Sequence, residues 1–150
     1  MTILNTNVVS ELMRPAPDPA VSRWFHTQAA DDAHITVITV AEILYGIEFI
    51  PHGKRRDALH AGAERMFGVV FSDRILAFAE SSARAFSLIA AARRKRGRPM
   101  SELDAQIAAI TRASNATLAT RNISDFEGYG VKLAIPGRNN NQPCHSERSE

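Results

Sequence analysis

Five side chains that carry oxygen ligands stand where short apolar runs end or on apolar helix faces: Asn5, Glu42, Asp104, Asn122 and Asp125. Clustered carboxylate and amide oxygens, without His or Cys, select a hard cation such as Mg²⁺ or Mn²⁺. Such an ion activates water and neutralises charge on a phosphate, which suits phosphodiester hydrolysis. The residue types are therefore compatible with a metal-dependent hydrolase, provided that the fold brings these side chains together.

Each of these residues also has an ordinary explanation when it is taken alone. On a helix, Glu42 shares its face with Tyr45, Gly46 and Phe49, and a buried carboxylate there needs a partner. Asp104 could simply stabilise the first turn of a helix. Asn122 is common in turns, and Asp125 could cap one.

The first fifteen residues organise the chain. An apolar Ile3-Leu4 run ends at the polar segment 5–7, and apolar residues then recur at helical spacing until Pro15. This pattern predicts a strand, a polar tip and a helix. In open α/β sheets ligands bind beyond the carboxyl ends of the strands, so the tip is the expected site edge.

Helices and strands alternate along the rest of the chain. Thr39 is predicted to cap the second of the following helices, Ser101 the last, and a β-prone stretch is predicted to begin at Val69. Helix-separated strands imply crossover connections, hence an α/β class with a mainly parallel sheet. The predicted helices cover 19–30, 40–50, 54–67, 80–96 and 102–114, and the predicted strands 34–37, 74–78, 116–120 and 131–135.

Length and composition predict one compact domain over residues 1–136. The chain has 150 residues, of which 45% are hydrophobic and 23% charged, with a net charge of +2. Residues 137–150 lack an apolar face and are predicted to be a disordered tail. The single cysteine, Cys144, precludes an intrachain disulfide, and neither a signal peptide nor a membrane span is indicated, so a cytoplasmic location is expected.

Other chemistries are less compatible with the sequence. The five histidines lack zinc-ligand spacing, and Ser10 lacks the glycines of a nucleophile elbow. Gly53-Lys54 lacks the phosphate-loop pattern because position 48 is Glu and position 55 is Arg.

Four stretches, taken in order, resemble the signature blocks of PIN-domain proteins, and more narrowly toxins of the VapC/FitB type. The similarity runs from about residue 2 to residue 136 and rests on residues 3–13, 38–46, 103–109 and 119–126. It implies a three-layer α/β/α fold with a central parallel sheet, and ribonuclease activity that depends on Mg²⁺ or Mn²⁺. It also implies a homodimer and a VapB-type antitoxin that blocks the site, with operator DNA contacted only through that antitoxin.

The resemblance assigns roles by position. Glu42 and Asp104 match the metal-binding acids of the family, and Asn122 and Asp125 match a block with one or two positions at the metal. Thr6 matches a hydroxyl held close to the acids, and Asn7 the residue that opens the first helix. With residue 5, these acids form the expected catalytic group Asn5, Glu42, Asp104 and Asp125.

Residue 5 departs from the family, which has Asp there as a central metal ligand. Asn5 keeps the shape and one carbonyl oxygen but lacks a negative charge, so metal binding should be weaker. The prediction is an impaired nuclease on a nuclease fold, whether the change is natural or engineered. A non-catalytic module that binds antitoxin, and a DNA-directed nuclease of the same fold, are the alternatives.

Two further surfaces follow from the resemblance. The basic run Arg93, Arg94, Lys95 and Arg96 could hold RNA phosphates near the site, or could equally be a solvated helix end that complements the helix dipole. An antitoxin segment along the early helices would contact Leu12, Met13, Trp24 and Phe49.

Overall fold

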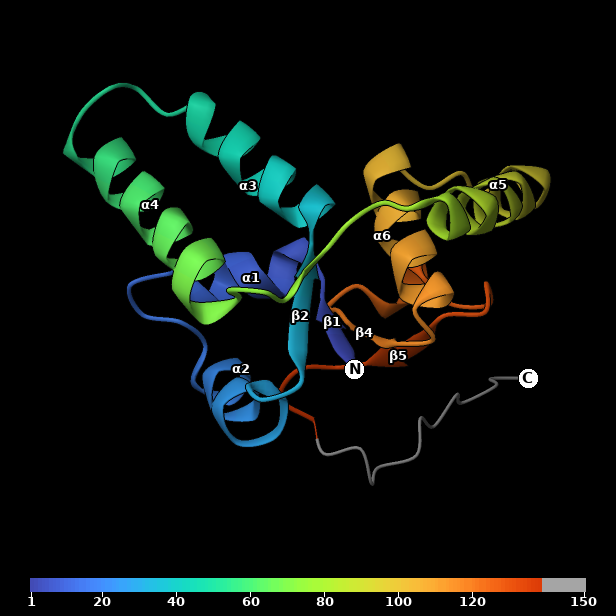
Figure 1. Cartoon of the computed structure of the whole chain (residues 1–150), viewed down its shortest axis with the longest axis horizontal. Helices are drawn as coiled ribbons and strands as arrows, with labels where there is room; N and C mark the ends of the chain where they lie inside the picture. Colours follow the sequence, from blue (N-terminus) through green and yellow to red (C-terminus); the bar gives the residue numbers. More distant parts are fainter. Residues whose placement is uncertain (139–150) are drawn as a thin grey trace, which may run out of the picture.

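A five-stranded parallel sheet lies at the centre of the molecule (Figure 1). The computed structural model describes residues 1–138. The strands are arranged in the order β3-β2-β1-β4-β5. They span Thr2–Leu4 (β1), Ala33–Thr36 (β2), Ile75–Leu76 (β3), Thr117–Ala119 (β4) and Lys132–Ala134 (β5). The predicted α/β class with a parallel sheet is confirmed.

The order in which strands are added to the sheet reverses at β1. The chain first adds β2 and β3 on one side of β1, and then returns to add β4 and β5 on the other side. Ile3 is in register with His34 of β2 and with Leu118 of β4. The loops that follow β1 and β4 therefore diverge, and open α/β proteins have their ligand-binding crevice at such a point, beyond the carboxyl ends of the two strands.

Helices cover both faces of the sheet. Leu4 packs into a hydrophobic cluster with α1 to α4, whereas the preceding Ile3 packs on the opposite side with α5 and α6, as alternation along a strand requires. Figure 1 shows α5 and α6 together on one side and α3 paired with α4 on the other. The helices span Thr6–Leu12 (α1), Pro19–Trp24 (α2), Val37–Glu48 (α3), Lys54–Arg65 (α4), Glu80–Lys95 (α5) and Glu102–Ala113 (α6).

The structure and the sequence prediction differ most clearly at two elements. Helix α3 begins at Val37, because the Thr36 hydroxyl accepts a hydrogen bond from the Thr39 backbone N–H at 3.2 Å and so caps the helix. Thr36 is thus the cap that was predicted for Thr39. Residues Met66–Val70 form a π-helical turn, η2, which continues α4 and places Phe67 and Phe71 in the core. The β-prone stretch predicted at Val69 is therefore wrong.

Two other expectations concern the C-terminal tail and membrane-spanning helices. The predicted tail, residues 137–150, lies outside the described residues from position 139 onward. Within residues 1–138 each helix is too short or too polar to span a bilayer.

Candidate functional site

Asn5 lies at the carboxyl end of β1 and is only 4% exposed. Its Oδ1 accepts a hydrogen bond from the backbone N–H of Thr6 at 2.9 Å, so the residue caps α1. Its Nδ2 donates to Thr120 Oγ1 at 3.0 Å. Both ends of the amide are therefore satisfied by protein groups.

Thr120 links the two halves of the crevice. It directly follows β4, is fully buried, and its hydroxyl also accepts from the Asn122 backbone N–H at 3.1 Å and from Asn7 Nδ2 at 3.4 Å. The sequence alone assigned no role to this residue. The signal available there was its position as the last residue of the predicted strand 116–120, at the expected site edge.

Glu42 reaches the same edge from α3. Its Oε1 accepts a hydrogen bond from Thr6 Oγ1 at 2.8 Å, and Thr6 Oγ1 also lies 3.0 Å from Thr39 Oγ1. Thr39 and Glu42 are three residues apart and so share one face of the helix. Thr6 therefore lies beside the acid, as the resemblance implied, and Thr39 joins the group.

Asp104 lies in the first turn of α6, where the Ser101 hydroxyl accepts a hydrogen bond from its backbone N–H at 3.1 Å. Burial raises the pKa of Glu42, the Thr6 hydrogen bond opposes that increase, and the negative charge of Asp104 adds to it. The structure thus brings Glu42 and Asp104 close enough to repel each other.

The last two predicted ligands lie further out. Asn122 joins the group because its backbone N–H donates a hydrogen bond to Thr120 Oγ1, and its side chain is exposed. Asp125 is exposed at the end of a one-turn 3₁₀ helix, η3, over Ile123–Asp125. Among residues 1–138, no hydrogen bond or ion pair connects the Asp125 side chain to the other acids.

The oxygen atoms at this site suit a hard cation as ligands, but they carry little negative charge. It offers two carboxylates, the Asn5 amide oxygen and hydroxyls, all of them oxygen ligands of the kind that Mg²⁺ and Mn²⁺ prefer. In the described part of the chain, no three His, Cys, Asp or Glu residues gather closely enough to hold a metal. The buried Asn7 Oδ1 has no hydrogen-bond partner in this part of the chain, so one oxygen acceptor near Thr120 is unsatisfied. The residues fit a cation, with one acid fewer than Asp at position 5 would supply.

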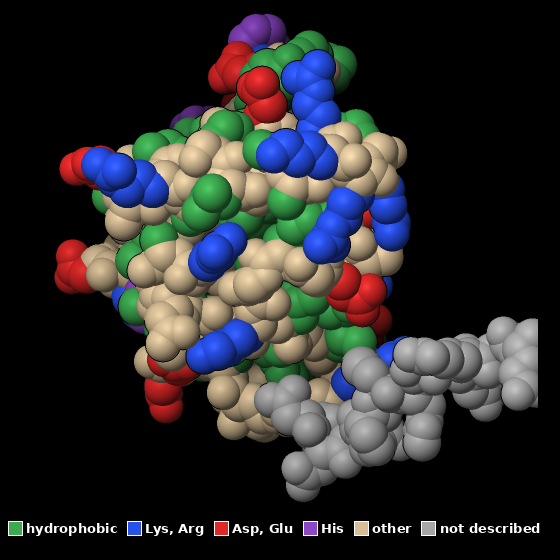
Figure 2. All heavy atoms as spheres, turned by 90° about the vertical axis from the view of Figure 1, so that its right-hand side faces the viewer, with side chains coloured by type: hydrophobic (Ala, Val, Ile, Leu, Met, Phe, Trp, Pro, Cys, Tyr) green, Lys and Arg blue, Asp and Glu red, His purple; other side chains and the backbone are tan. Residues whose placement is uncertain are grey.

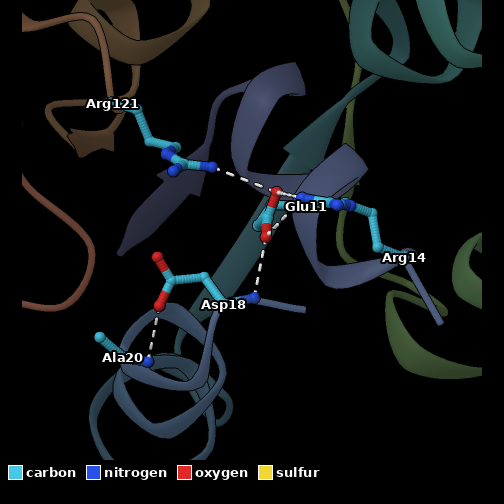
Figure 3. A network of polar contacts seen from close by, with 5 residues as sticks. All are labelled: Glu11, Arg14, Asp18, Ala20 and Arg121. Carbon is cyan, nitrogen blue, oxygen red and sulfur yellow. Dashed lines mark hydrogen bonds and ion pairs between the residues drawn. The ribbon is translucent and has the colours of Figure 1, made fainter. Parts of the chain in front are cut away.

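A buried carboxylate, Glu11, lies near the end of α1 (Figure 3). It accepts from the Asp18 backbone N–H at 2.8 Å and forms ion pairs with Arg14 and Arg121, each at 3.2 Å. The Asp18 N–H is the main cause that lowers the pKa of Glu11, and the two arginines add to it against the effect of burial. Neither Glu11 nor Arg121 was predicted from the sequence.

An apolar groove of about 720 Å³ opens beside the acids between α1, α3 and α4. Thr6 and Glu42 contribute to its wall, so the groove is continuous with the candidate site. The other lining residues are Ser10, Met13, Arg14, Pro15, Ile43, Gly46, Ile47, Ile50, Arg55, Ala58 and Leu59.

The groove residues predicted from the sequence are found in different places. Met13 lines the groove, and Leu12 is partly buried against the core. Trp24 is 6% exposed inside that core, so it does not form part of a docking surface. Phe49 is 71% exposed, packs edge-to-face against Tyr45 and is not among the lining residues.

The basic run also divides into two kinds of residue. Arg93 is 5% exposed, and its guanidinium lies 5.0 Å from the centre of the Tyr129 ring, so this arginine is mainly a packing residue. Arg94, Lys95 and Arg96 are exposed, although the Arg96 guanidinium also lies 5.0 Å from the centre of the Tyr129 ring. Figure 2, viewed from the side of α5 and α6, shows Lys and Arg side chains distributed over this face.

The fold and the acidic edge define a small doubly wound α/β protein with an oxygen-lined site at its switch point. The family model described as PIN domain matches residues 2–130. The chain belongs to the PIN-domain family, and within it to the VapC/FitB type.

Named relatives match almost the whole described chain. The plasmid stability protein StbB of Pseudomonas syringae is 37% identical, with 91% of this chain and 98% of that protein covered. Toxin FitB of Neisseria gonorrhoeae is 33% identical over 91% of this chain and 98% of the relative. VapC ribonuclease Y4jK of Sinorhizobium fredii is also 33% identical, with coverage of 91% and 97%.

A solved structure agrees with this assignment. The structure of FitAB bound to an IR36 DNA fragment superimposes with a TM-score of 0.83 at 32% identity. The match covers 92% of this chain and 96% of that chain.

Proposed function

We propose that this protein is the toxin of a type II toxin–antitoxin pair, and that its chemistry is cleavage of RNA phosphodiesters with Mg²⁺ or Mn²⁺. The observation that carries the proposal is the set of hydrogen bonds that joins Asn5, Thr6 and Glu42 at the carboxyl end of β1, with the negative charge of Asp104 near enough to raise the pKa of Glu42. Two carboxylates whose charges repel each other leave a site that a cation would stabilise. The similarity to a VapC ribonuclease supports RNA as the substrate.

Glu42, Asp104 and the oxygen of residue 5 would hold the ion, with Asn122 and Asp125 on the exposed side. When bound, the ion would supply charge neutralisation at the scissile phosphate and a more acidic water. One of these acids would position the attacking water. The Thr6 hydroxyl holds the Glu42 carboxylate in place by donating to Oε1.

Asn5 weakens this arrangement. Its amide oxygen already accepts a hydrogen bond from the Thr6 backbone N–H, and its amide nitrogen donates one to the Thr120 hydroxyl. An uncharged group that serves as a helix cap is a poorer ligand for a divalent cation than a carboxylate. We therefore infer that activity in this form is strongly reduced.

An antitoxin is proposed as the partner, with operator DNA contacted only through it. The groove beside Glu42 is lined by residues of α1, α3 and α4, and its lining is mainly apolar. A chain segment seated there would also cover the acids, because Thr6 and Glu42 form part of the same wall. A homodimer remains part of the proposal, to be measured by light scattering.

Arg94, Lys95 and Arg96 are proposed to hold RNA phosphates. They are exposed at the end of α5, and residues 96–101 connect this end directly to α6, which carries Asp104. The short connection limits how far these cations can lie from the first turn of α6. Such contacts add affinity that weakens with salt and does not depend on RNA sequence.

The decisive experiment restores the acid. Asn5→Asp and the unaltered chain are incubated with single-stranded RNA and with DNA of the same sequence, each with Mn²⁺ and with EDTA. We expect metal-dependent cleavage of RNA by Asn5→Asp, little by the unaltered chain, and none after Glu42→Gln is added. Restored cleavage of DNA but not RNA would support the DNA-directed alternative instead.

A non-catalytic module is the second candidate, and the missing third acid favours it. In that case the protein as it stands would bind its antitoxin but no Mn²⁺. Titration with Mn²⁺, followed by electron paramagnetic resonance, separates the two: binding with slow cleavage supports the enzyme, and no binding before Asn5→Asp supports the module.

A further inference from the structure

Glu11 is the buried carboxylate that the proposed chemistry leaves unused. Its side chain is 8% exposed, which would be costly for a charge without partners. Three groups satisfy it: the Asp18 backbone N–H, Arg14 and Arg121 (Figure 3). The carboxylate is thus fixed from three directions, and one of them comes from a distant part of the chain.

Arg121 brings the loop after β4 into this network. It lies between Thr120, whose hydroxyl accepts from Asn5, and Asn122, whose backbone N–H donates to Thr120. Thr120 therefore contacts the residue that caps the start of α1, whereas the adjacent Arg121 contacts Glu11 near its end. Two successive residues hold the exit of β4 at both ends of one helix.

We propose that Glu11 is a positioning residue for the candidate site. By holding Arg121 it fixes the segment that carries Thr120 and Asn122 against the end of β1. It thereby sets where the oxygens of residues 5 and 122 lie relative to Glu42. The inference rests on the proposed function only for its consequence, which is cation affinity; the coupling itself is a property of the unaltered protein.

The coupling is tested first in the unaltered chain. The Asn5 side-chain NH₂ gives a pair of proton–nitrogen NMR signals that disappear in Asn5→Asp and are thus identified. Glu11→Gln and Arg121→Gln should each shift these signals and the Asn122 amide. The matched control Glu80→Gln removes an exposed carboxylate paired with Arg84 on α5 and should leave them in place. Unshifted signals in both network variants would overturn the proposal.

Cation affinity is the second test. In the Asn5→Asp background, Glu11→Gln should weaken Mn²⁺ binding by roughly tenfold, as removal of groups that orient metal ligands does. Arg121→Gln should have a similar effect, and the double variant should be no weaker than either alone. An ion pair with a purely stabilising role would lower the melting temperature and leave the Mn²⁺ dissociation constant unchanged, which would refute the positioning role.

Using both Glu11→Gln and Arg121→Gln keeps the test informative if one of the variants does not fold. Arg121→Gln leaves Glu11 paired with Arg14 and the Asp18 N–H, so the carboxylate stays satisfied if Glu11→Gln proves too unstable. Should the Asn5→Asp parent neither bind Mn²⁺ nor cleave RNA, the proposed function fails. The NMR measurement on the unaltered chain then still decides whether Glu11 controls the loop.

Discussion

Asn5 and Thr120, 115 residues apart in sequence, share a buried hydrogen bond in which the Asn5 amide donates to the threonine hydroxyl at 3.0 Å. An aspartate at position 5 cannot donate, so the hydroxyl would have to turn and donate instead. The aspartate would also add a third negative charge beside Glu42 and Asp104. We expect Asn5→Asp to lower the stability of the metal-free protein by about 1–2 kcal/mol, from the altered hydrogen bond and charge repulsion.

The measurement is thermal unfolding with EDTA and with Mn²⁺. Binding to the folded state alone stabilises it, so Mn²⁺ should raise the melting temperature of Asn5→Asp more than that of the unaltered chain. Equal shifts in both proteins would show that residue 5 is not a ligand.

Glu42 should make stability depend on pH. Its pKa is raised by burial and by Asp104, so its contribution to stability is full below the unfolded pKa and is lost as the pH rises through the folded pKa. Glu42→Gln lacks this titration, and its stability relative to the parent should therefore improve from acidic to neutral pH. Urea unfolding across that range measures the difference. A difference that is constant with pH would contradict the raised pKa.

Thr120 should matter for stability as well as for the site. Thr120→Val keeps the shape but removes the acceptor for Asn5 Nδ2 and for the Asn122 backbone N–H. Buried donors left without a partner should cost about 1–3 kcal/mol, as measured by urea unfolding. Thr117→Val, on the same strand but partly exposed, is the control and should stay within about 0.5 kcal/mol of the parent.

Gly46 offers a way to separate the groove from the fold. A Cβ built at this position on α3 meets no atom within 4 Å, so Gly46→Ala should stabilise the helix by about 0.5–1 kcal/mol. Gly46→Phe should place a ring in the groove that Gly46 lines. Only the phenylalanine variant is expected to lose antitoxin in a pull-down of the co-expressed pair. Retained antitoxin in that variant would argue against docking there.

The basic run should respond to mutation in two different ways. Arg93→Ala removes the buried interaction with Tyr129 and should cost about 1–2 kcal/mol of stability. Arg94→Ala should leave stability unchanged within about 0.5 kcal/mol. It should instead reduce the salt dependence of RNA binding, by about 0.7 in the log–log slope if Arg94 neutralises one phosphate of a single strand. The opposite assignment of effects would mean that Arg93 is the residue that meets the substrate.

The regular parts of the fold were predictable because local pattern and long-range packing agree. Ser101 caps α6 as the spacing to Asp104 predicted, and both bonded neighbours of β1 are parallel to it. The β-prone stretch predicted at Val69 was wrong because the strand propensity of this residue is weaker than the gain from burying Phe67 and Phe71 in a continued helical turn. Local propensity fails where a few large side chains decide the path of the chain.

The site was predictable as a set of acids but not as a network. Glu42 and Asp104 stand out because a carboxylate on an apolar helix face needs an explanation. Thr120 is a common residue type for a strand, and its role depends on the pairing of β1 with β4. The ion pair between Glu11 and Arg121 likewise joins positions 110 residues apart, which no local pattern reports.

The late arrival of β4 beside β1 has a consequence for synthesis of the protein. Asn5, Glu42 and Asp104 are all translated before the strand that completes the crevice, which spans Thr117–Ala119. A nascent chain that stops short of this point carries the acids and can pair β1 with β2, but it lacks the strand that pairs with Leu4 at the end of β1. The proposed site is therefore complete only after β4 has been synthesised and has left the ribosome.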